Sequence, residues 1–140
     1  MLIVEDDPII GDDLSVIAEE AGNEVVGVAR QASDARALSS LDPELALVDI
    51  NLMDGPTGPH ICSELARRDV TVVLMTANVK QIPLNLSGAI GALAKPFTTK
   101  TIQDVFAYAD SLRHGGAIKI PRCLISANSG PIWRHPAYPI

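Results

Sequence analysis

Polar side chains that can take part in chemistry follow four apolar runs of the sequence, at the point where each run ends. They are Glu5 and Asp6 after residues 2–4, Asp49 after residues 45–48, Thr76 after residues 70–75, and Lys95 after residues 90–94. Short apolar runs bounded by loop residues are typical of strands buried on both faces of a parallel sheet. Ligands and reactive groups gather at the carboxyl ends of such strands, so we expect these five side chains to meet at one rim.

The three carboxylates of this group indicate a cation site. Carboxylates that are held close together repel one another, and they stay ionised together only with a cation between them. A small set of oxygen ligands with room for water suits Mg²⁺. Lys95 and Thr76 could then bind the oxygens of a phosphoryl group, whose charge must be stabilised during transfer. Taken singly, each residue also has a structural explanation: helix capping for the acids, a strand end for Thr76, and a surface position for Lys95.

The elements that must position these residues alternate along the chain. Besides the four runs above, residues 24–29 read as the second strand, and this is the only strand expected to end without a reactive side chain. Helical spacing of apolar residues follows each strand, with Pro8 in the first turn of the first helix, Ser33 as the cap of the second, Pro59 opening the third, and Thr98 or Thr99 capping the last.

The helix expected between the fourth and fifth strands, over residues 79–86, is the weakest because Pro83 interrupts it. Five strand-then-helix units with short connections predict an α/β domain. Its parallel sheet is doubly wound, with right-handed crossovers and helices on both faces. This domain is complete by residue 112.

Four motifs taken together resemble the receiver domain of two-component response regulators. They are residues 2–8, 47–49, 74–77 and 95–97, in the family's order and at its spacing. The resemblance covers about residues 1–112 and implies a flavodoxin-like (βα)5 fold with strand order 2-1-3-4-5. It also implies a cytoplasmic switch that accepts a phosphoryl group from a sensor histidine kinase or a histidine phosphotransfer protein. Such a switch catalyses its own phosphorylation and dephosphorylation and is not a turnover enzyme.

The resemblance assigns a role to each motif residue. Asp49 is the phosphoacceptor. The implied Mg²⁺ ligands are Asp6, Asp49, Glu5 through water, and the backbone carbonyl of Asn51. The groups implied to bind the phosphoryl group are Lys95, the hydroxyl of Thr76 and the backbone amide of Ala77.

One position departs from the family's pattern. An aromatic residue commonly stands three positions before the strand-end lysine, and here that residue is Ala92. Alanine has no ring to move on phosphorylation, so we expect signalling to rely on shifts in residues 77–86 or on another surface. The departure also keeps open an alternative function, a receiver-like protein-interaction module that works independently of phosphorylation.

Two other classes fit the sequence less well. A Mg²⁺-dependent phosphatase with an aspartyl-phosphate would carry its nucleophile after the first strand and would need a cap over its substrate. A flavin or nucleotide module would need a hydroxyl-rich or glycine-rich turn after the first strand, where this chain has three acids that repel phosphate.

Charge and composition set the remaining expectations. The net charge is −6, yet residues 113–140 hold four basic residues and no acidic one. The acidic body argues against nucleic-acid binding, and no apolar run is long enough to span a membrane. We expect Cys62 and Cys123 to be free thiols. Residues 113–140 are expected to form a flexible basic tail, in which Trp133 and Tyr138 could dock on the body or on a partner. No output domain is expected. The sequence does not identify the downstream protein target, and it allows a homodimer.

Overall fold

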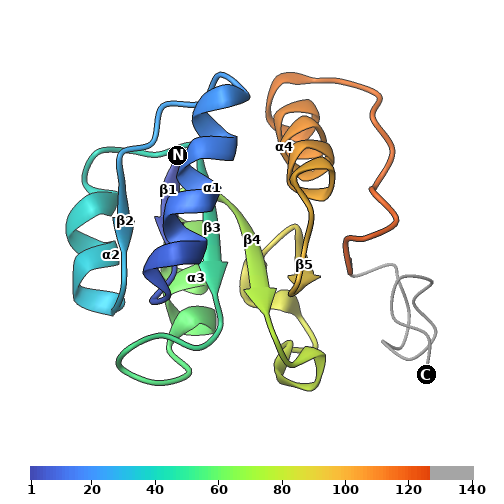
Figure 1. Cartoon of the computed structure of the whole chain (residues 1–140). Helices are drawn as coiled ribbons and strands as arrows, with labels where there is room; N and C mark the ends of the chain where they lie inside the picture. The colour runs from blue at the N-terminus through green and yellow to red at the C-terminus, as the bar shows by residue number, and fades with distance from the viewer. Residues whose placement is uncertain (127–140) are drawn as a thin grey trace.

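A single parallel sheet organises the protein, which a computed structural model describes over residues 1–126. Its five strands lie in the order β2-β1-β3-β4-β5 (Figure 1). The strands are β1 (Leu2–Val4), β2 (Gly27–Ala29), β3 (Leu45–Asp49), β4 (Thr71–Thr76) and β5 (Gly91–Ala94). The flavodoxin-like α/β fold and the predicted strand order are therefore confirmed.

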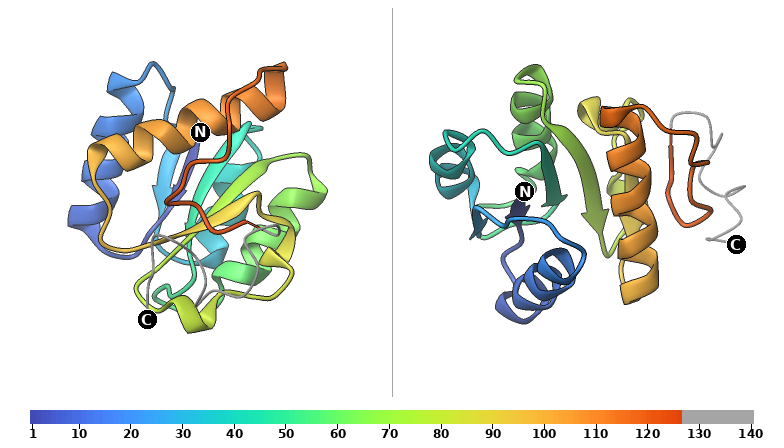
Figure 2. Two further views of the ribbon diagram at one scale, coloured as in Figure 1. Left: turned by 90° about the vertical axis from the view of Figure 1, so that its right-hand side faces the viewer. Right: turned by 90° about the horizontal axis from the view of Figure 1, so that it is seen from above.

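Helices cover both faces of this sheet (Figures 1 and 2). They are α1 (Pro8–Glu20), α2 (Ala32–Ser39), α3 (Gly58–Arg67) and α4 (Thr99–His114), with short 3-10 turns η1 (Val79–Gln81) and η2 (Leu86–Gly88). Helices α1 and α4 pack on one face, and α2 and α3 pack on the other. None of the helices within residues 1–126 has the length and apolar character needed to cross a bilayer.

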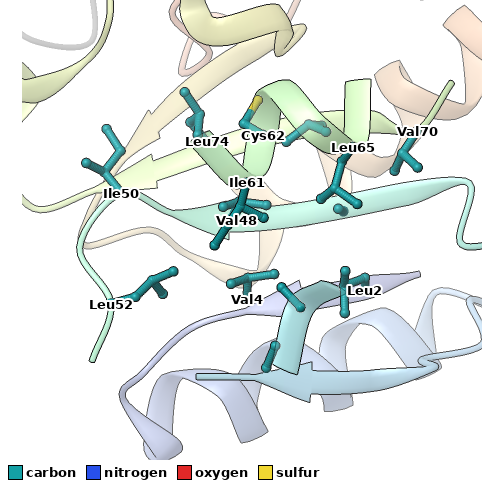
Figure 3. Close-up of a cluster of buried hydrophobic side chains, with 14 of the residues drawn as sticks. Leu2, Val4, Val48, Ile50, Leu52, Ile61, Cys62, Leu65, Val70 and Leu74 are labelled. Carbon is teal, nitrogen blue, oxygen red and sulfur yellow. The ribbon is translucent and has the colours of Figure 1, made fainter. Parts of the chain in front are cut away.

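Alternate strand residues divide the core into two clusters, one on each face. The cluster under α2 and α3 contains Leu2, Val4 and Val48 (Figure 3). The cluster under α1 and α4 contains Ile3 and Leu47. Every residue of β1 and β3 is buried. A polar side chain that follows either strand is therefore presented at the rim of the core, as the sequence predicted.

The first helix begins as expected. Pro8 opens α1, and the carboxylate of Asp7 caps it by accepting hydrogen bonds from the backbone N–H groups of Ile9 and Ile10. Thr98 caps α4 through the backbone N–H of Thr101. Because Asp7 is used as a cap, the acidic loop leaves Glu5 and Asp6 for the site.

The predicted cap of the second helix is wrong. Helix α2 begins at Ala32, so Ser33 lies inside its first turn, and the capping position is taken by Gln31 without a side-chain bond. The backbone N–H of Ala32 is instead satisfied by the carboxylate of Asp54, 3.1 Å away in the loop after β3. A cap supplied from a distant loop leaves no local signal in the sequence.

The predicted helix between β4 and β5 is absent, so the described chain has four α-helices and not five. The 3-10 turns η1 and η2 take its place. Pro83 stands between them and removes a backbone donor, and Leu86 and Ser87 adopt positive φ angles of 56° and 52°. The last crossover to β5 is consequently a packed loop.

The last helix extends past the predicted domain boundary at residue 112. Helix α4 continues to His114, and the chain then returns along the outer edge of the sheet. Leu124 and Ile125 are buried, and Ile125 pairs with Ala92 of β5. The start of the predicted tail thus packs on the body. Residues 127–140, with Trp133 and Tyr138, lie outside the described residues.

Candidate functional site

Three carboxylates converge at the carboxyl ends of β1 and β3. These strands are neighbours with Val4 opposite Val48, so the residues that follow them lie side by side. Carboxylate oxygens of Glu5, Asp6 and Asp49 lie within 4.8 Å of one another. Glu5 and Asp49 are only 1% and 5% exposed, whereas Asp6 is half-exposed and opens the cluster to solvent.

Lys95 supplies the positive charge of this cluster. Its Nζ atom lies 2.7 Å from Oε2 of Glu5 and 2.8 Å from Oδ2 of Asp49. The side chain is only 15% exposed, so water screens these ion pairs weakly. One ammonium faces three carboxylates, which leaves the site with excess negative charge.

The pKa values of Glu5 and Lys95 reflect both their burial and the charges around them. Burial raises the pKa of Glu5 to about 7; the hydrogen bond from Lys95 opposes this shift, and the charge of Asp49 adds to it. Burial acts to lower the pKa of Lys95, but hydrogen bonds to Asp49 and Glu5 outweigh it and the pKa is raised. A further cation would relieve the repulsion between the carboxylates. The all-oxygen donor set fits Mg²⁺.

Thr76 and Ala77 lie at the same rim, at the end of β4. Asp49 is opposite Met75 in the β3–β4 register, so Thr76 is one residue farther along the neighbouring strand. The buried Thr76 hydroxyl donates to the carbonyl of Asn78 and accepts from its N–H, both at 2.9 Å. Ala77 is exposed. The Thr76 hydroxyl therefore holds the start of η1 in this state.

Asn51 lies next to Asp49 in the loop after β3. Its backbone N–H donates to Oδ1 of Asp49 at 3.3 Å. Its side-chain amide exchanges two hydrogen bonds with the amide of Gln81, at 2.7 and 3.3 Å. This pair joins the acidic site to η1. It could not be expected from the sequence, because two exposed amides thirty residues apart carry no pattern.

Arg30 lies beside the site although the sequence did not predict it there. It follows β2, the strand expected to end without a reactive side chain. Its Nε and Nη2 atoms donate to the backbone carbonyl of Asp6 at 3.2 and 3.0 Å. Its position directly after the second strand was the available signal. Arg30 adds positive charge beside the acidic loop and holds that loop in place.

Gly58 fixes the position of Asp49 from the other side. A Cβ atom at Gly58 would lie 2.0 Å from the carbonyl oxygen of Asp49 and 2.6 Å from Cα of Ile50. The start of α3 therefore packs directly against the backbone of the acidic loop. Only glycine permits this approach.

A groove of about 680 Å³ adjoins the site on the α1 side. Its lining residues include Lys95 and Ala77 at the site end and Ile10, Val16, Ile17 and Phe97 along the walls. Val16 is 53% exposed. The reactive rim thus continues into an apolar surface.

Comparisons with known proteins agree with this geometry. The family model described as the response regulator receiver domain matches residues 1–107. The chain is 34% identical over 116 residues to the phyllosphere-induced regulator PhyR of Methylorubrum extorquens, covering 78% of this chain and 42% of that protein. It is 31% identical over 103 residues to the transcriptional regulatory protein PdtaR of Mycobacterium tuberculosis, covering 70% of this chain and 50% of that protein. The chain thus spans about half the length of these curated relatives or slightly less.

A solved structure extends the comparison to three dimensions. The solution structure of the receiver domain of the Erythrobacter litoralis response regulator PhyR aligns with a TM-score of 0.71 and 25% identity. The alignment covers 86% of this chain and 94% of that domain.

Proposed function

The chain belongs to the response regulator receiver domain family, and on that premise we propose that it is a phosphorelay switch with Asp49 as its phosphoacceptor. The observation that carries the proposal is the buried contact of Lys95 with both Asp49 and Glu5. A cation that neutralises a buried carboxylate can also bind the oxygens of a phosphoryl group attached to it.

The proposed donor is a sensor histidine kinase or a histidine phosphotransfer protein. A carboxylate oxygen of Asp49 forms a bond to phosphorus as the bond between phosphorus and the donor imidazole nitrogen breaks. The departing imidazole takes a proton from solvent. Lys95, the Thr76 hydroxyl and the Ala77 amide bind the phosphoryl oxygens, which carry the charge of the loose transition state.

Mg²⁺ would be held by Asp6, Asp49, the carbonyl of Asn51 and, through water, Glu5. When bound, it neutralises phosphoryl charge during transfer. The convergence of three carboxylates supports this assignment, because they outnumber the one ammonium that pairs with them.

The groove beside Lys95 is the proposed contact surface for the donor protein. It adjoins the reactive rim and exposes apolar side chains such as Val16. A folded donor can bury this surface while it presents a histidine at the rim. The proposal places this exchange in the cytoplasm.

One observation favours a second function, a receiver-like interaction module that works without phosphorylation. Ala92 lacks the ring that commonly reports phosphorylation in the family, and its position is paired with Ile125. In this alternative, partner binding is the same with and without a phosphoryl group.

Stoichiometry tests the switch against turnover chemistry. The protein is incubated with Mg²⁺ and excess acetyl phosphate, or with excess p-nitrophenyl phosphate in a parallel sample. We expect no more than one phosphoryl group per chain and no sustained release of p-nitrophenol. Sustained release in proportion to time would instead indicate a phosphatase. If neither sample shows phosphorylation or release of p-nitrophenol, with or without Mg²⁺, the result would favour the phosphorylation-independent module.

A further inference from the structure

Residues 116–126, the C-terminal strap, close the outer edge of β5. The strap leaves α4 at Gly115 and returns alongside β5 (Figure 2, left). Ala92 and Ile125 form an antiparallel bridge in which each backbone N–H donates to the other's carbonyl, at 2.8 and 2.9 Å. Near its start, the N–H of Gly116 donates to the carbonyl of Ser111 at 3.0 Å.

Two consecutive apolar side chains of the strap clamp β5 from opposite faces. Leu124 is 1% exposed in the cluster under α1 and α4, and Ile125 is 5% exposed in the cluster under α3. The strand residues beneath them are small. A Cβ atom at Gly91 would lie 2.5 Å from Cγ of Leu124, so this glycine makes room for the strap.

The strap and the loop between the site and β5 pack against the same cluster, the one under α2 and α3. Val79, Ile82 and Ala89 pack against the cluster that contains both Ala92 and Ile125. Val79 belongs to η1, whose capping residue Asn78 is held by the Thr76 hydroxyl. Val79, next to the residue that the Thr76 hydroxyl holds, therefore packs against the same cluster as Ile125.

We propose that phosphorylation of Asp49 releases the C-terminal strap from β5, an inference that rests on the proposed function. The Thr76 hydroxyl has one proton, and in this state it donates that proton to Asn78. If it donates to a phosphoryl oxygen on Asp49 instead, the carbonyl of Asn78 loses this donor and keeps the N–H of Gln81, at 3.0 Å, so the start of η1 is held less firmly. Movement of Val79 and Ile82 then opens the cluster that holds Ile125.

The design of the strap suits release. Among the residues that the structure describes, one pair bridges the strap to β5, and Ile118 and Ile120 on its earlier part are 51% and 40% exposed. Within residues 116–126, Leu124 and Ile125 are the side chains buried in the body. Segments with few buried contacts open more readily than the core around them.

Cys123 reports the state of the strap, because it directly precedes Leu124 and is partly buried. Its rate of alkylation by iodoacetamide is measured by peptide mass spectrometry, with Mg²⁺ alone and with Mg²⁺ plus acetyl phosphate. Phosphoryl occupancy is read from intact mass in the same samples. We expect alkylation of Cys123 to accelerate about tenfold in the phosphorylated protein, since local opening exposes the thiol.

Variants separate release from unrelated effects. Ile125→Ala should accelerate alkylation without any phosphoryl donor, whereas Ile118→Ala, at an exposed position of the same strap, should not. Asp49→Asn should show no response to acetyl phosphate.

High phosphoryl occupancy with an unchanged alkylation rate in the wild-type protein would overturn this inference and leave the proposed function intact. Absence of a phosphoryl adduct together with absence of a beryllofluoride complex would overturn both.

Discussion

The Nζ atom of Lys95 lies 2.8 Å from Oδ2 of Asp49, although 46 positions separate the two residues in the sequence. Each is placed by the end of a different strand, β5 for the lysine and β3 for the aspartate. The same ammonium also contacts Glu5. In the resting site, Lys95 thus holds a charge that phosphoryl transfer would require.

Replacing Lys95 should destabilise the protein most when no metal is present. Lys95→Met leaves Glu5 and Asp49 buried without their cation, a change that typically costs about 3–5 kcal/mol. We expect a large drop in the free energy of unfolding in EDTA at pH 8, measured by urea denaturation. Mg²⁺ should recover part of this loss, because it replaces the missing charge.

Lys100→Met is the matched control. Lys100 pairs with Asp104 at 2.7 Å, but its side chain is 78% exposed, so we expect little change. Equal losses in the two variants would contradict the importance of the buried pair.

Ionisation of Glu5 should weaken the metal-free fold as pH rises. Its pKa is about 7 in the folded protein against an ordinary value of 4.5, so the folded state binds more protons than the unfolded state between these values. This contribution to stability is complete below pH 4.5 and is lost as pH rises through 7. Glu5→Gln should therefore be more stable than wild type at pH 8 in EDTA, by about 1–3 kcal/mol.

Thermal unfolding of both proteins across the pH range, in EDTA, checks this sign. The advantage of Glu5→Gln should disappear as the pH approaches 4.5. A variant that is less stable than wild type at pH 8 would show that the Glu5 carboxylate is favourable in the metal-free site.

Adding one methyl group at Gly58 should displace the acidic loop. The new Cβ would lie 2.0 Å from the carbonyl of Asp49, where only a backbone shift can relieve the clash. We expect Gly58→Ala to lose about 2–4 kcal/mol of stability and to accept phosphoryl groups more slowly. Gly11→Ala is the control, because its Cβ would meet only a side-chain methyl of Val28 at 3.1 Å. Similar behaviour of the two variants would mean that the backbone around Asp49 adapts.

The two cysteines should differ in reactivity. Burial raises the pKa of Cys62 to about 12, and its Sγ atom lies 3.4 Å from the carbonyl of Ser87, so the reactive thiolate is absent near neutral pH. In the native protein at about pH 8, iodoacetamide should modify Cys123 and spare Cys62; in urea it should modify both. Mass spectrometry of the two peptides reads this directly. Modification of native Cys62 at the rate seen in urea would contradict its burial on the inner side of α3.

Much of the fold could be predicted because its signals are periodic or local. The runs at 2–4 and 45–48 are fully buried strands, and the acids that follow them meet as expected. Asp7 and Thr98 cap their helices through bonds to nearby residues. The site could be predicted for the same reason, because the ends of parallel strands meet at one rim whatever lies between them in the sequence.

The features that were missed depend on contacts between distant residues. The Asp54 carboxylate that caps α2 comes from another loop, and the amide pair of Asn51 and Gln81 joins two loops. The bridge of Ile125 to Ala92 involves one residue pair and therefore leaves no strand-like pattern. The missing helix before β5 was signalled by Pro83, but a helix was still expected from the regular alternation of the other units.

Intact mass tests the central claim most directly. The wild-type protein and Asp49→Asn are incubated with acetyl phosphate and Mg²⁺, with and without a chelator. We expect a single phosphoryl adduct on the wild-type chain, lost with the chelator and absent from Asp49→Asn. An adduct that persists on Asp49→Asn, or no wild-type adduct with acetyl phosphate together with no beryllofluoride complex, would contradict Asp49 as the phosphoacceptor.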